Sequence, residues 1–444
     1  MSTNTEKSTG TRAAVPAPGE PAAERSGFDD LVHPDVATAF PYRKGMNTPG
    51  MLRARRVVRR VTGKDIFPTQ DQIDAFCADM FAADPVAERF VDEVFYGEIG
   101  PVRGRAMLKQ ALAEGLSSIQ DPPPSMVALF DEFEKVPDWV DPEVVEAGAR
   151  VWRRWGTMLF SVAGGITLEM YTEAAVATPL SLAGGYAGDN ALRRFLETAR
   201  FWIDVSEPGA LLTPGSTGRA TAMMVRVMHV SVRRRVAEHP EWDTSRWGIP
   251  ISQSYMMMTL LGGSVAPALA LWTTGIQTTR SEIYQLIAFQ RYLGHVVGVR
   301  SRWYPQTIAD SLRLLALVSV ARSHDAGDHG AELITSFPRA FAPRDGHTGF
   351  RRLRETYNGG VYAAYARLFM MPQTYRRYDM PSAFPWLLWV VGRVPLVAVV
   401  ETARRIPVVG RVHEKWMRRH RESWYHAQMD GREAEFDASG ALRR

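Results

Sequence analysis

Apolar residues recur at intervals of three and four positions along most of this chain, from about residue 69 onward. The pattern is clear in TQDQIDAFCADMFAA (residues 69–83) and in EVVEAGARVWRRWGTMLFSVAG (residues 143–164), and strict alternation is scarce. Such spacing predicts amphipathic helices rather than strands. The stretches between them carry turn signals: DPPPS, EPGALLTPGS and PRDGHTG. No internal repeat or long Pro/Gly-rich linker interrupts residues 69–380, so we expect one all-α domain.

The two terminal segments depart from this pattern. Residues 1–27 are rich in Pro, Ala, Ser and Glu and lack the apolar stretch of a signal peptide. We therefore expect a disordered tail there, and a cytoplasmic protein. The helical domain is expected over residues 28–383. Residues 384–444 form a third segment, which is apolar at first (FPWLLWVVGRVPLVAVV) and basic afterwards.

The segment 384–444 has two interpretations. Its apolar part contains two prolines and Arg393 and is shorter than the ~20 residues that a membrane span needs. The basic run that follows suits anionic headgroups, which predicts peripheral contact with the inner face of a membrane. The alternative is a pair of helices packed on the body of the protein, followed by a solvated tail.

Composition narrows the chemistry further. The 444 residues include 53 basic and 48 acidic ones, a formal charge of +5, which is too small an excess to indicate a nucleic-acid partner. A single cysteine, Cys77, excludes intramolecular disulfides, thiolate zinc sites and cysteine-ligated iron–sulfur clusters. Its helical surroundings predict an inert thiol in the core.

A lone histidine, His229, interrupts an apolar helix face in MMVRVMHVSVRRRV (residues 223–236). The face is formed by residues three and four apart: Ala222, Val225, His229, Val232 and Val236, widened by Met224 and Met228. Four arginines are expected largely off it: Arg226, Arg233, Arg234 and Arg235. A buried imidazole costs about 1–3 kcal/mol for each unmet polar group, so another element or a cofactor must satisfy it. His229 is then either a core histidine bonded to a backbone carbonyl or an axial ligand of heme iron.

A second helix is predicted over DNALRRFLETARFWIDV (residues 189–205). Its apolar face is Leu192, Phe195, Leu196, Ala199 and Ile203. Arg194 and Thr198 lie four apart at an edge of this face, where an arginine could clamp a carboxylate such as a heme propionate. An ordinary ion pair to another helix explains Arg194 equally well. Arg193 and Glu197 are expected to form a separate, exposed salt bridge.

These residues together resemble a known family. RxxxT (Arg194 to Thr198), a helix histidine 31 positions on, WGIPIS (247–252) and RYLGHVVGVRSRWYP (291–305) are similar to the catalytic domain of MpaB-type oxygenases and latex-clearing (rubber) oxygenases. The resemblance covers roughly residues 150–340. It implies a globin-like helical core that holds a non-covalent heme b.

The resemblance also implies roles for individual residues. His229 would be the proximal iron ligand, and Arg194 and Thr198 would be polar residues beside the cofactor and candidates for catalysis. The activity would be O2-dependent oxidation of an apolar, isoprenoid- or lipid-like substrate. A non-catalytic heme or lipid binding protein is the alternative. Glu169 and Glu173 are candidates for the family's catalytic glutamate.

Two features depart from the family pattern. Latex-clearing enzymes carry a lysine that can ligate iron immediately before the threonine, where this chain has Glu197. Those enzymes are usually exported, whereas this chain shows no export signal, so polymeric rubber is not the expected substrate.

Two other motifs contain histidines that could bind a cofactor or a metal ion. In YLGHVVG, His295 lies between Gly294 and Gly298, which suits either a role in cofactor binding or close helix packing around a core histidine. HDAGDH (324–329) could bind a divalent metal, although acids at the start of a helix are also expected for capping.

Overall fold

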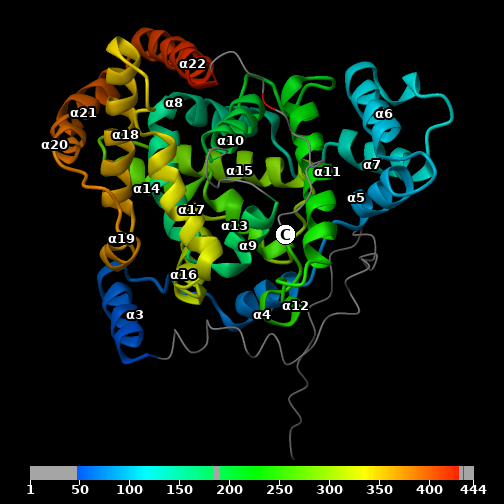
Figure 1. Cartoon of the computed structure of the whole chain (residues 1–444), viewed down its shortest axis with the longest axis horizontal. Helices are drawn as coiled ribbons and strands as arrows, with labels where there is room; N and C mark the ends of the chain where they lie inside the picture. The colour runs from blue at the N-terminus through cyan, green and yellow to red at the C-terminus, as the bar shows by residue number, and fades with distance from the viewer. Residues whose placement is uncertain (1–47, 184–190, 430–433, 435–444) are drawn as a thin grey trace, which may run out of the picture.

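The structure, a computed structural model, describes residues 48–183, 191–429 and 434. Every regular element in these ranges is a helix, which confirms the predicted all-α class (Figure 1). The elements are α3 (Pro49–Thr62), α4 (Gln70–Asp79), α5 (Pro85–Phe90), η2 (Val91–Phe95), α6 (Pro101–Glu114), η3 (Leu116–Ser118), α7 (Pro124–Glu134), α8 (Pro142–Met170), α9 (Ala174–Leu182), α10 (Ala191–Val205), α11 (Thr217–Ala237), α12 (Thr244–Trp247), α13 (Gln253–Leu261), α14 (Val265–Trp272), α15 (Arg280–Val296), α16 (Ile308–Ala321), α17 (Gly327–Ala340), α18 (Gly349–Phe369), α19 (Pro372–Arg377), α20 (Trp386–Gly392), α21 (Val394–Ala403) and α22 (Pro407–Met429).

The central helix is α8, which packs against α15, α18 and α22. It begins at Pro142, where the side chain of Asp141 accepts a hydrogen bond from the backbone N–H of Glu143 at 3.0 Å. A Cβ at Gly148 would lie 2.2 Å from the carbonyl oxygen of Gln285, so only glycine lets α15 approach this closely. The first half of α8 therefore sits in the middle of the hydrophobic core.

A break in α8 receives the last helix. Gly156 has φ +57° and ψ −143°, values that interrupt the helix and that L-residues rarely adopt. The side chain of Met417, from α22, occupies the space beside Gly156. The ring of Trp424 stacks on Phe160 with centroids 5.2 Å apart. The C-terminal helix thus lies on the surface of the body and inserts a few side chains into this break, while most of its other residues stay exposed.

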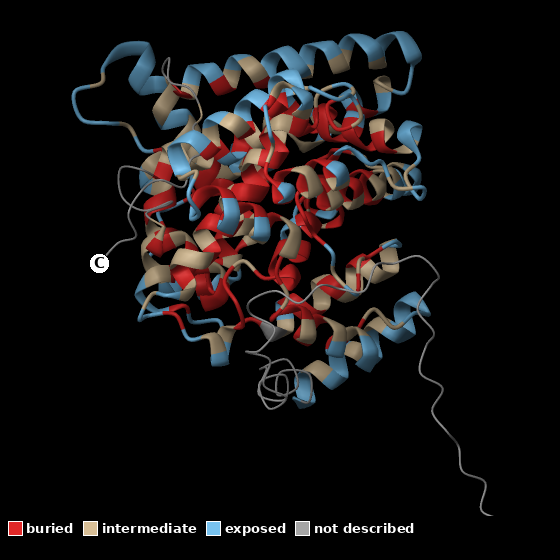
Figure 2. Cartoon of the chain, turned by 90° about the vertical axis from the view of Figure 1, so that its right-hand side faces the viewer, coloured by how far each residue is buried: buried red, intermediate tan, exposed pale blue. Residues whose placement is uncertain are grey.

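The N-terminal helices α5, α6 and α7 form one edge of the molecule, beside α11 (Figure 1). Figure 2 shows the burial pattern, with buried residues concentrated on the inner helices and exposed ones on the outer surfaces. Cys77 is buried in the core, as predicted. The methionine-rich helix α13 is almost wholly buried in the core.

The structure bears on only one of the two terminal segments. The tail predicted over residues 1–27 lies outside the described residues. Within 384–444, α20 to α22 pack on the body, and Val390, Tyr425 and Met429 belong to the main hydrophobic core. The outward side of α20 and α21 remains exposed. Residues on both sides of position 384 pack on the same body, and the domain boundary placed there stays a prediction.

Candidate functional site around His229

The helix that carries His229 is α11. The side chain of Ser216 accepts a hydrogen bond from the backbone N–H of Arg219 at 3.2 Å, and this cap fixes where the helix begins. The stripe that contains His229 was predicted to be buried, and it is buried only in part: Ala222, Val225 and Val236 are buried, whereas Val232, Met224 and Met228 are half-buried. His229 is itself half-buried, so this stripe is only partly covered by protein.

The imidazole of His229 has an unmet polar atom. Its Nδ1 is shielded from solvent, and no hydrogen-bond partner for it is found in the part of the chain that the structure describes. Burial, reinforced by the positive charge of Arg233, lowers the pKa of His229 to about 4, although Asp84 opposes the shift. The ring is therefore a neutral nitrogen base at physiological pH, with apolar side chains around it.

The arginines of α11 correct the sequence prediction. Arg226 and Arg233, expected off the buried face, are both 1% exposed, and Arg219 is 2% exposed. Their seven-residue spacing places them on one line of the helix. This line is more deeply buried than the stripe that contains His229. The helix is thus enclosed by protein on its charged side and only partly covered on its apolar side.

Each buried arginine has partners from distant segments. Arg226 donates to Asp84 (Nε–Oδ2 2.7 Å and Nη2–Oδ1 2.9 Å) and to Glu132 (2.6 Å). Arg233 donates to the backbone carbonyls of Pro250 and Ile251 at 3.0 and 2.8 Å. The motif WGIPIS therefore supplies two acceptors that hold α11 in place.

The second motif, RYLGHVVGVRSRWYP, also contacts this arginine line. Gly298 has φ +83°, and a Cβ there would lie 2.0 Å from Oδ2 of Asp84. Both motifs therefore support the helix that carries His229. Their role in the structure is to position α11, which no local pattern in the sequence indicated.

Arg194 and Glu197 form an ion pair within α10, which packs beside α11. Nη1 of Arg194 lies 2.8 Å from Oε2 of Glu197, and Nη1 of Arg193 lies 3.6 Å from Oε1. The predicted pair of Arg193 with Glu197 is present, but it is neither exposed nor separate, because Glu197 is 5% exposed and also pairs with Arg194. One buried carboxylate balances two arginines.

Thr198 lies on the exposed side of the same helix. Its hydroxyl donates to the backbone carbonyl of Arg194 at 3.1 Å. The Nε of Arg194 is shielded from solvent and has no hydrogen-bond partner among the described residues. The structure thus brings Arg194 and Thr198 to one edge of α10, and a role for either at a cofactor stays a prediction.

His295 differs from His229 in having a partner. It hydrogen-bonds to the backbone of Lys135, and its ring stacks on Tyr292 with centroids 6.3 Å apart. Burial and the nearby Arg226 lower its pKa to about 4. The surroundings of His295 match the alternative interpretation, a core histidine between packing glycines, and its cofactor role also stays a prediction.

The two candidate glutamates have distinct environments. Glu169 lies 3.2 Å from Nη2 of Arg322 and accepts from the backbone of Met371 and the hydroxyl of Thr374. These contacts use both of its oxygens in structural bonds. Glu169 therefore ties the end of α8 to the segments before α17 and α19.

Glu173 caps α9 and is the more unusual carboxyl group. It accepts from the backbone N–H of Ser323 at 2.7 Å and of Ala175 at 3.3 Å, and it lies 3.5 Å from the hydroxyl of Tyr255. Burial raises its pKa, although these hydrogen bonds oppose the shift. A carboxyl of this kind can hold a proton at a pH where an exposed glutamate has lost it.

The histidine-rich loop 324–329 does not form a metal site in the structure. Asp325 pairs with Arg377 at 2.9 Å, and His329 contacts Ser181 and Glu241. Within residues 48–183, 191–429 and 434, no group of three or more His, Cys, Asp or Glu side chains could hold an ion. The capping interpretation agrees with Asp328 in the first turn of α17.

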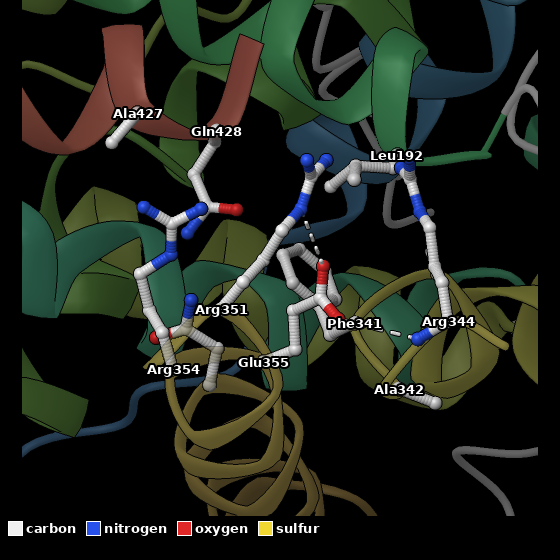
Figure 3. A pocket seen from close by; sticks show the side chains of 11 residues that line it. Leu192, Phe341, Ala342, Arg344, Arg351, Arg354, Glu355, Ala427 and Gln428 are labelled. Carbon is white, nitrogen blue, oxygen red and sulfur yellow. Dashed lines mark hydrogen bonds and ion pairs between the residues drawn. The ribbon is translucent and has the colours of Figure 1, made fainter. Parts of the chain in front are cut away.

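A cationic cavity of about 30 Å³ lies apart from His229 (Figure 3). Its charged lining residues are Arg344, Arg351, Arg354 and Glu355. Glu355 already accepts from His347 at 2.8 Å and from the backbone of Arg344 at 3.2 Å. None of His229, Arg194, Thr198 or His295 lines this cavity, so it is separate from the predicted site.

The helical arrangement defines the class of protein first. It is similar to the solved structure of latex clearing protein LCP in the closed state, with a TM-score of 0.56 and 19% sequence identity, over 78% of this chain and 91% of that one. This likeness shows the fold: the chain shares the helical architecture of that protein.

The sequence then defines the family. Residues 149–404 match the family described as "ER-bound oxygenase mpaB/B'/Rubber oxygenase, catalytic domain". The match spans more than half of the chain, so the chain belongs to this family. It is also 27% identical over 238 residues to the rubber oxygenase of Streptomyces sp. (strain K30), which is 51% of this chain and 54% of that relative. The chain thus spans about half the length of this curated relative.

Proposed function

We propose that this protein is a heme b-dependent oxygenase that uses O2 to oxidise an apolar, isoprenoid- or lipid-like substrate, with His229 as the axial ligand of the iron. The observation that carries the proposal is the buried Nδ1 of a neutral histidine without a partner among the described residues, on an apolar helix stripe. Membership of an oxygenase family and the likeness to a rubber oxygenase support the reaction class.

The residues around His229 suit a heme rather than a metal ion held by side chains alone. A porphyrin brings four of its own nitrogen ligands, so the protein must supply only one axial base and apolar walls. Clusters of three or more ligating side chains are absent from the described residues, whereas His229 is flanked by the half-buried Met224, Met228 and Val232. A bound heme b would supply the iron centre at which O2 is activated.

The protein's own contribution is electrostatic and steric. Burial and Arg233 keep His229 neutral, which is the state that an axial ligand requires. Arg194 and Thr198 would lie at the edge of the cofactor, where a carboxylate of the cofactor could share Arg194 with Glu197. Glu173, whose pKa is raised by burial, is the candidate for holding a proton during substrate oxidation.

We also propose where the substrate is met. An apolar substrate gains about 0.8 kcal/mol for each methylene it buries, so it concentrates in membranes as well as in apolar pockets. A cytoplasmic enzyme would encounter it at the inner face of a membrane. The proposal includes no nucleic-acid partner.

The optical spectrum of protein expressed with ample heme tests the cofactor and its ligand. The wild-type protein should show a Soret band, and His229→Ala should abolish or strongly weaken it. His295→Ala is the matched comparison: because His295 already bonds to the backbone of Lys135, its loss should leave the band in place. A normal heme spectrum in folded His229→Ala would disprove the ligand assignment.

Activity is tested separately from heme binding. Reduced protein is incubated with O2 and isoprenoids, and carbonyl products are sought by mass spectrometry. Product formation that needs both heme and O2 supports an oxygenase. A heme spectrum without any product would instead support the alternative, a non-catalytic heme or lipid binding protein.

A further inference from the structure

The C-terminal helices expose a continuous apolar surface. We define the apolar face by its large exposed side chains on and around α20, α21 and the first third of α22: Phe384, Leu388, Trp389, Val391, Leu396, Val399, Val400, Ile406, Val408, Val409, Val412 and Trp416. Leu388, Leu396 and Val399 are each more than 60% exposed. Single exposed apolar residues are ordinary on protein surfaces, but a run of this length marks an interaction site.

The apolar face is held rigidly to the core. The ring of Trp386 covers Gly360 of α18, and Nε1 of Trp389 donates to the hydroxyl of Tyr357 at 3.4 Å. On α21, Glu401 is 3% exposed and accepts from Arg154 of α8. These inward contacts fix α20 and α21 with their apolar side outward, so the surface is already formed in the isolated chain.

The charges beside the apolar face are almost entirely positive. Residues 384–420 contain only two acids, Glu401 and Glu414; Glu401 is buried, and Glu414 is partly buried and contacts Arg150 and Arg153. The exposed cations in the same stretch are Arg405, Arg411, Lys415, Arg418 and Arg419. Of these, Arg418 pairs with Glu207 and Arg405 bonds to Gln277. The surface is therefore complementary to an anionic partner with an apolar interior.

The lengths of α20 and α21 distinguish a segment that lies on a membrane surface from one that crosses the membrane. By length and composition alone, residues 386–403 could cross a membrane, as could the mostly buried residues 253–272. However, α20 has 7 residues and α21 has 10, or about 10 and 15 Å, and a bilayer core is about 30 Å thick. Arg393 lies between them and donates to the hydroxyl of Tyr365, which holds the break against the body.

We infer that the apolar face docks this protein on the surface of a bilayer that contains anionic lipids, with α20, α21 and the start of α22 lying in the plane of the headgroups. Trp389 and Trp416 enter the interfacial region, and the arginines contact the headgroup phosphates. The inference rests on the proposed function only for its purpose, which is access to an apolar substrate.

Vesicle sedimentation with the full-length protein tests this inference. The protein should bind vesicles of phosphatidylcholine with phosphatidylglycerol several-fold more strongly than vesicles of phosphatidylcholine alone, and added salt should reduce the difference. Leu396→Glu should weaken binding about tenfold, because it removes the apolar contact of this exposed side chain with the bilayer and adds a charge of the same sign as the lipids. Val102→Glu is the matched control, since Val102 is 78% exposed on α6 at the opposite edge of the molecule (Figure 1).

A double variant tests how much the basic residues contribute to vesicle binding. Arg411→Glu combined with Arg419→Glu should lower binding to the anionic vesicles about tenfold and leave the weaker binding to neutral vesicles unchanged. Circular dichroism and the melting temperature verify that each variant is folded.

Three outcomes would overturn the inference. The first is a wild-type protein that binds neither kind of vesicle, and the second is Leu396→Glu that binds as well as Val102→Glu. The third is a wild-type dimer that Leu396→Glu converts to a monomer without a change in vesicle binding, which would assign the apolar face to a second copy of the chain. If the protein binds vesicles but shows no heme spectrum, the proposed heme-dependent oxygenase function is refuted. The inferred docking surface is then still supported.

Discussion

Asp84 and Arg226 form a two-point ion pair beside the candidate ligand, with distances of 2.7 and 2.9 Å and with both side chains at most 2% exposed. Arg226 precedes His229 by three residues on α11, and Asp84 caps α5. Glu132 of α7 joins the same pair and also contacts Arg300. The N-terminal helices are thus tied electrostatically to the helix on which the proposed cofactor site depends.

Removing the carboxylate of this pair should destabilise the fold. Asp84→Asn leaves part of the Arg226 charge unbalanced in the interior, so the free energy of unfolding should fall by about 3 kcal/mol, measured by urea denaturation. Asp325→Asn is the control, because Asp325 and Arg377 form an exposed pair and its loss should cost less than about 1 kcal/mol. Equal losses in the two variants would contradict the buried assignment.

Stability should decrease as the pH falls from about 6.5 to about 4. Burial lowers the pKa values of His229 and His295 to about 4, so in this range the unfolded chain binds a proton at each ring and the folded chain does not. Each histidine then contributes at most ~1.4 kcal/mol per pH unit. Denaturation between pH 4 and pH 8 measures the slope, which His229→Ala should reduce.

Asp84 should add acid sensitivity only at lower pH. Burial alone would raise the pKa of Asp84, but Arg226 and Arg300 outweigh it and the net pKa is lowered. Its contribution to stability is therefore fully present above its unfolded pKa of about 4 and is lost below it. In Asp84→Asn, the loss of stability below pH 4 should be shallower than in the wild type.

Glu197 should couple more strongly to Arg194 than to Arg193. The Arg194 contact is 2.8 Å and the Arg193 contact is 3.6 Å, so double-mutant cycles of Glu197→Gln with each arginine changed to Met should give about 1 kcal/mol and less than 0.5 kcal/mol. Thermal or urea unfolding supplies the free energies. Comparable coupling to both arginines would mean that Arg194 is free to turn toward another partner.

Glu173→Gln should separate proton handling from cofactor binding. If the raised pKa of Glu173 serves the reaction, this variant should retain the Soret band and lose about 100-fold in product formation. Glu169→Gln provides the contrast, because its bonds to Arg322 and Thr374 predict a lower melting temperature instead. Full activity in Glu173→Gln would remove this residue from the mechanism.

The helices were predicted well because the spacing of apolar residues that are close together in the sequence indicates them. Apolar spacing located α4 and α8, whereas the stripe of His229, predicted to be buried, is buried only in part. The arginine line of α11 was missed, since arginines are normally solvated and the acidic partners of Arg226 and Arg233 lie 94 to 145 residues away. Arg219, Arg226 and Arg233 recur every seven residues, a signal that could have indicated a second buried line.

In the candidate site, too, local features could be predicted from the sequence and contacts between distant segments could not. The helix pattern singled out His229 as a lone imidazole on an apolar face, and its role as an iron ligand came from the family resemblance. Its exposure depends on which other helices cover it, and spacing carries no such information. The burial of Glu197 was also missed, because an i,i+4 pair with Arg193 is typical of an exposed surface. The motif WGIPIS was recognised only as a family feature, since its role as an acceptor for Arg233 appears only in three dimensions.

The break in α8 at Gly156 has a consequence for folding during translation. Arg153 of α8 contacts Glu414 of α22 across 261 positions of sequence, and Met417 fills the space that Gly156 leaves open. During synthesis at about 5–20 residues per second, the centre of α8 therefore waits roughly 10–50 s for the helix that closes it. Until then its apolar surface is open to other chains or to chaperones, so nascent protein should be most vulnerable to aggregation just before α22 leaves the ribosome.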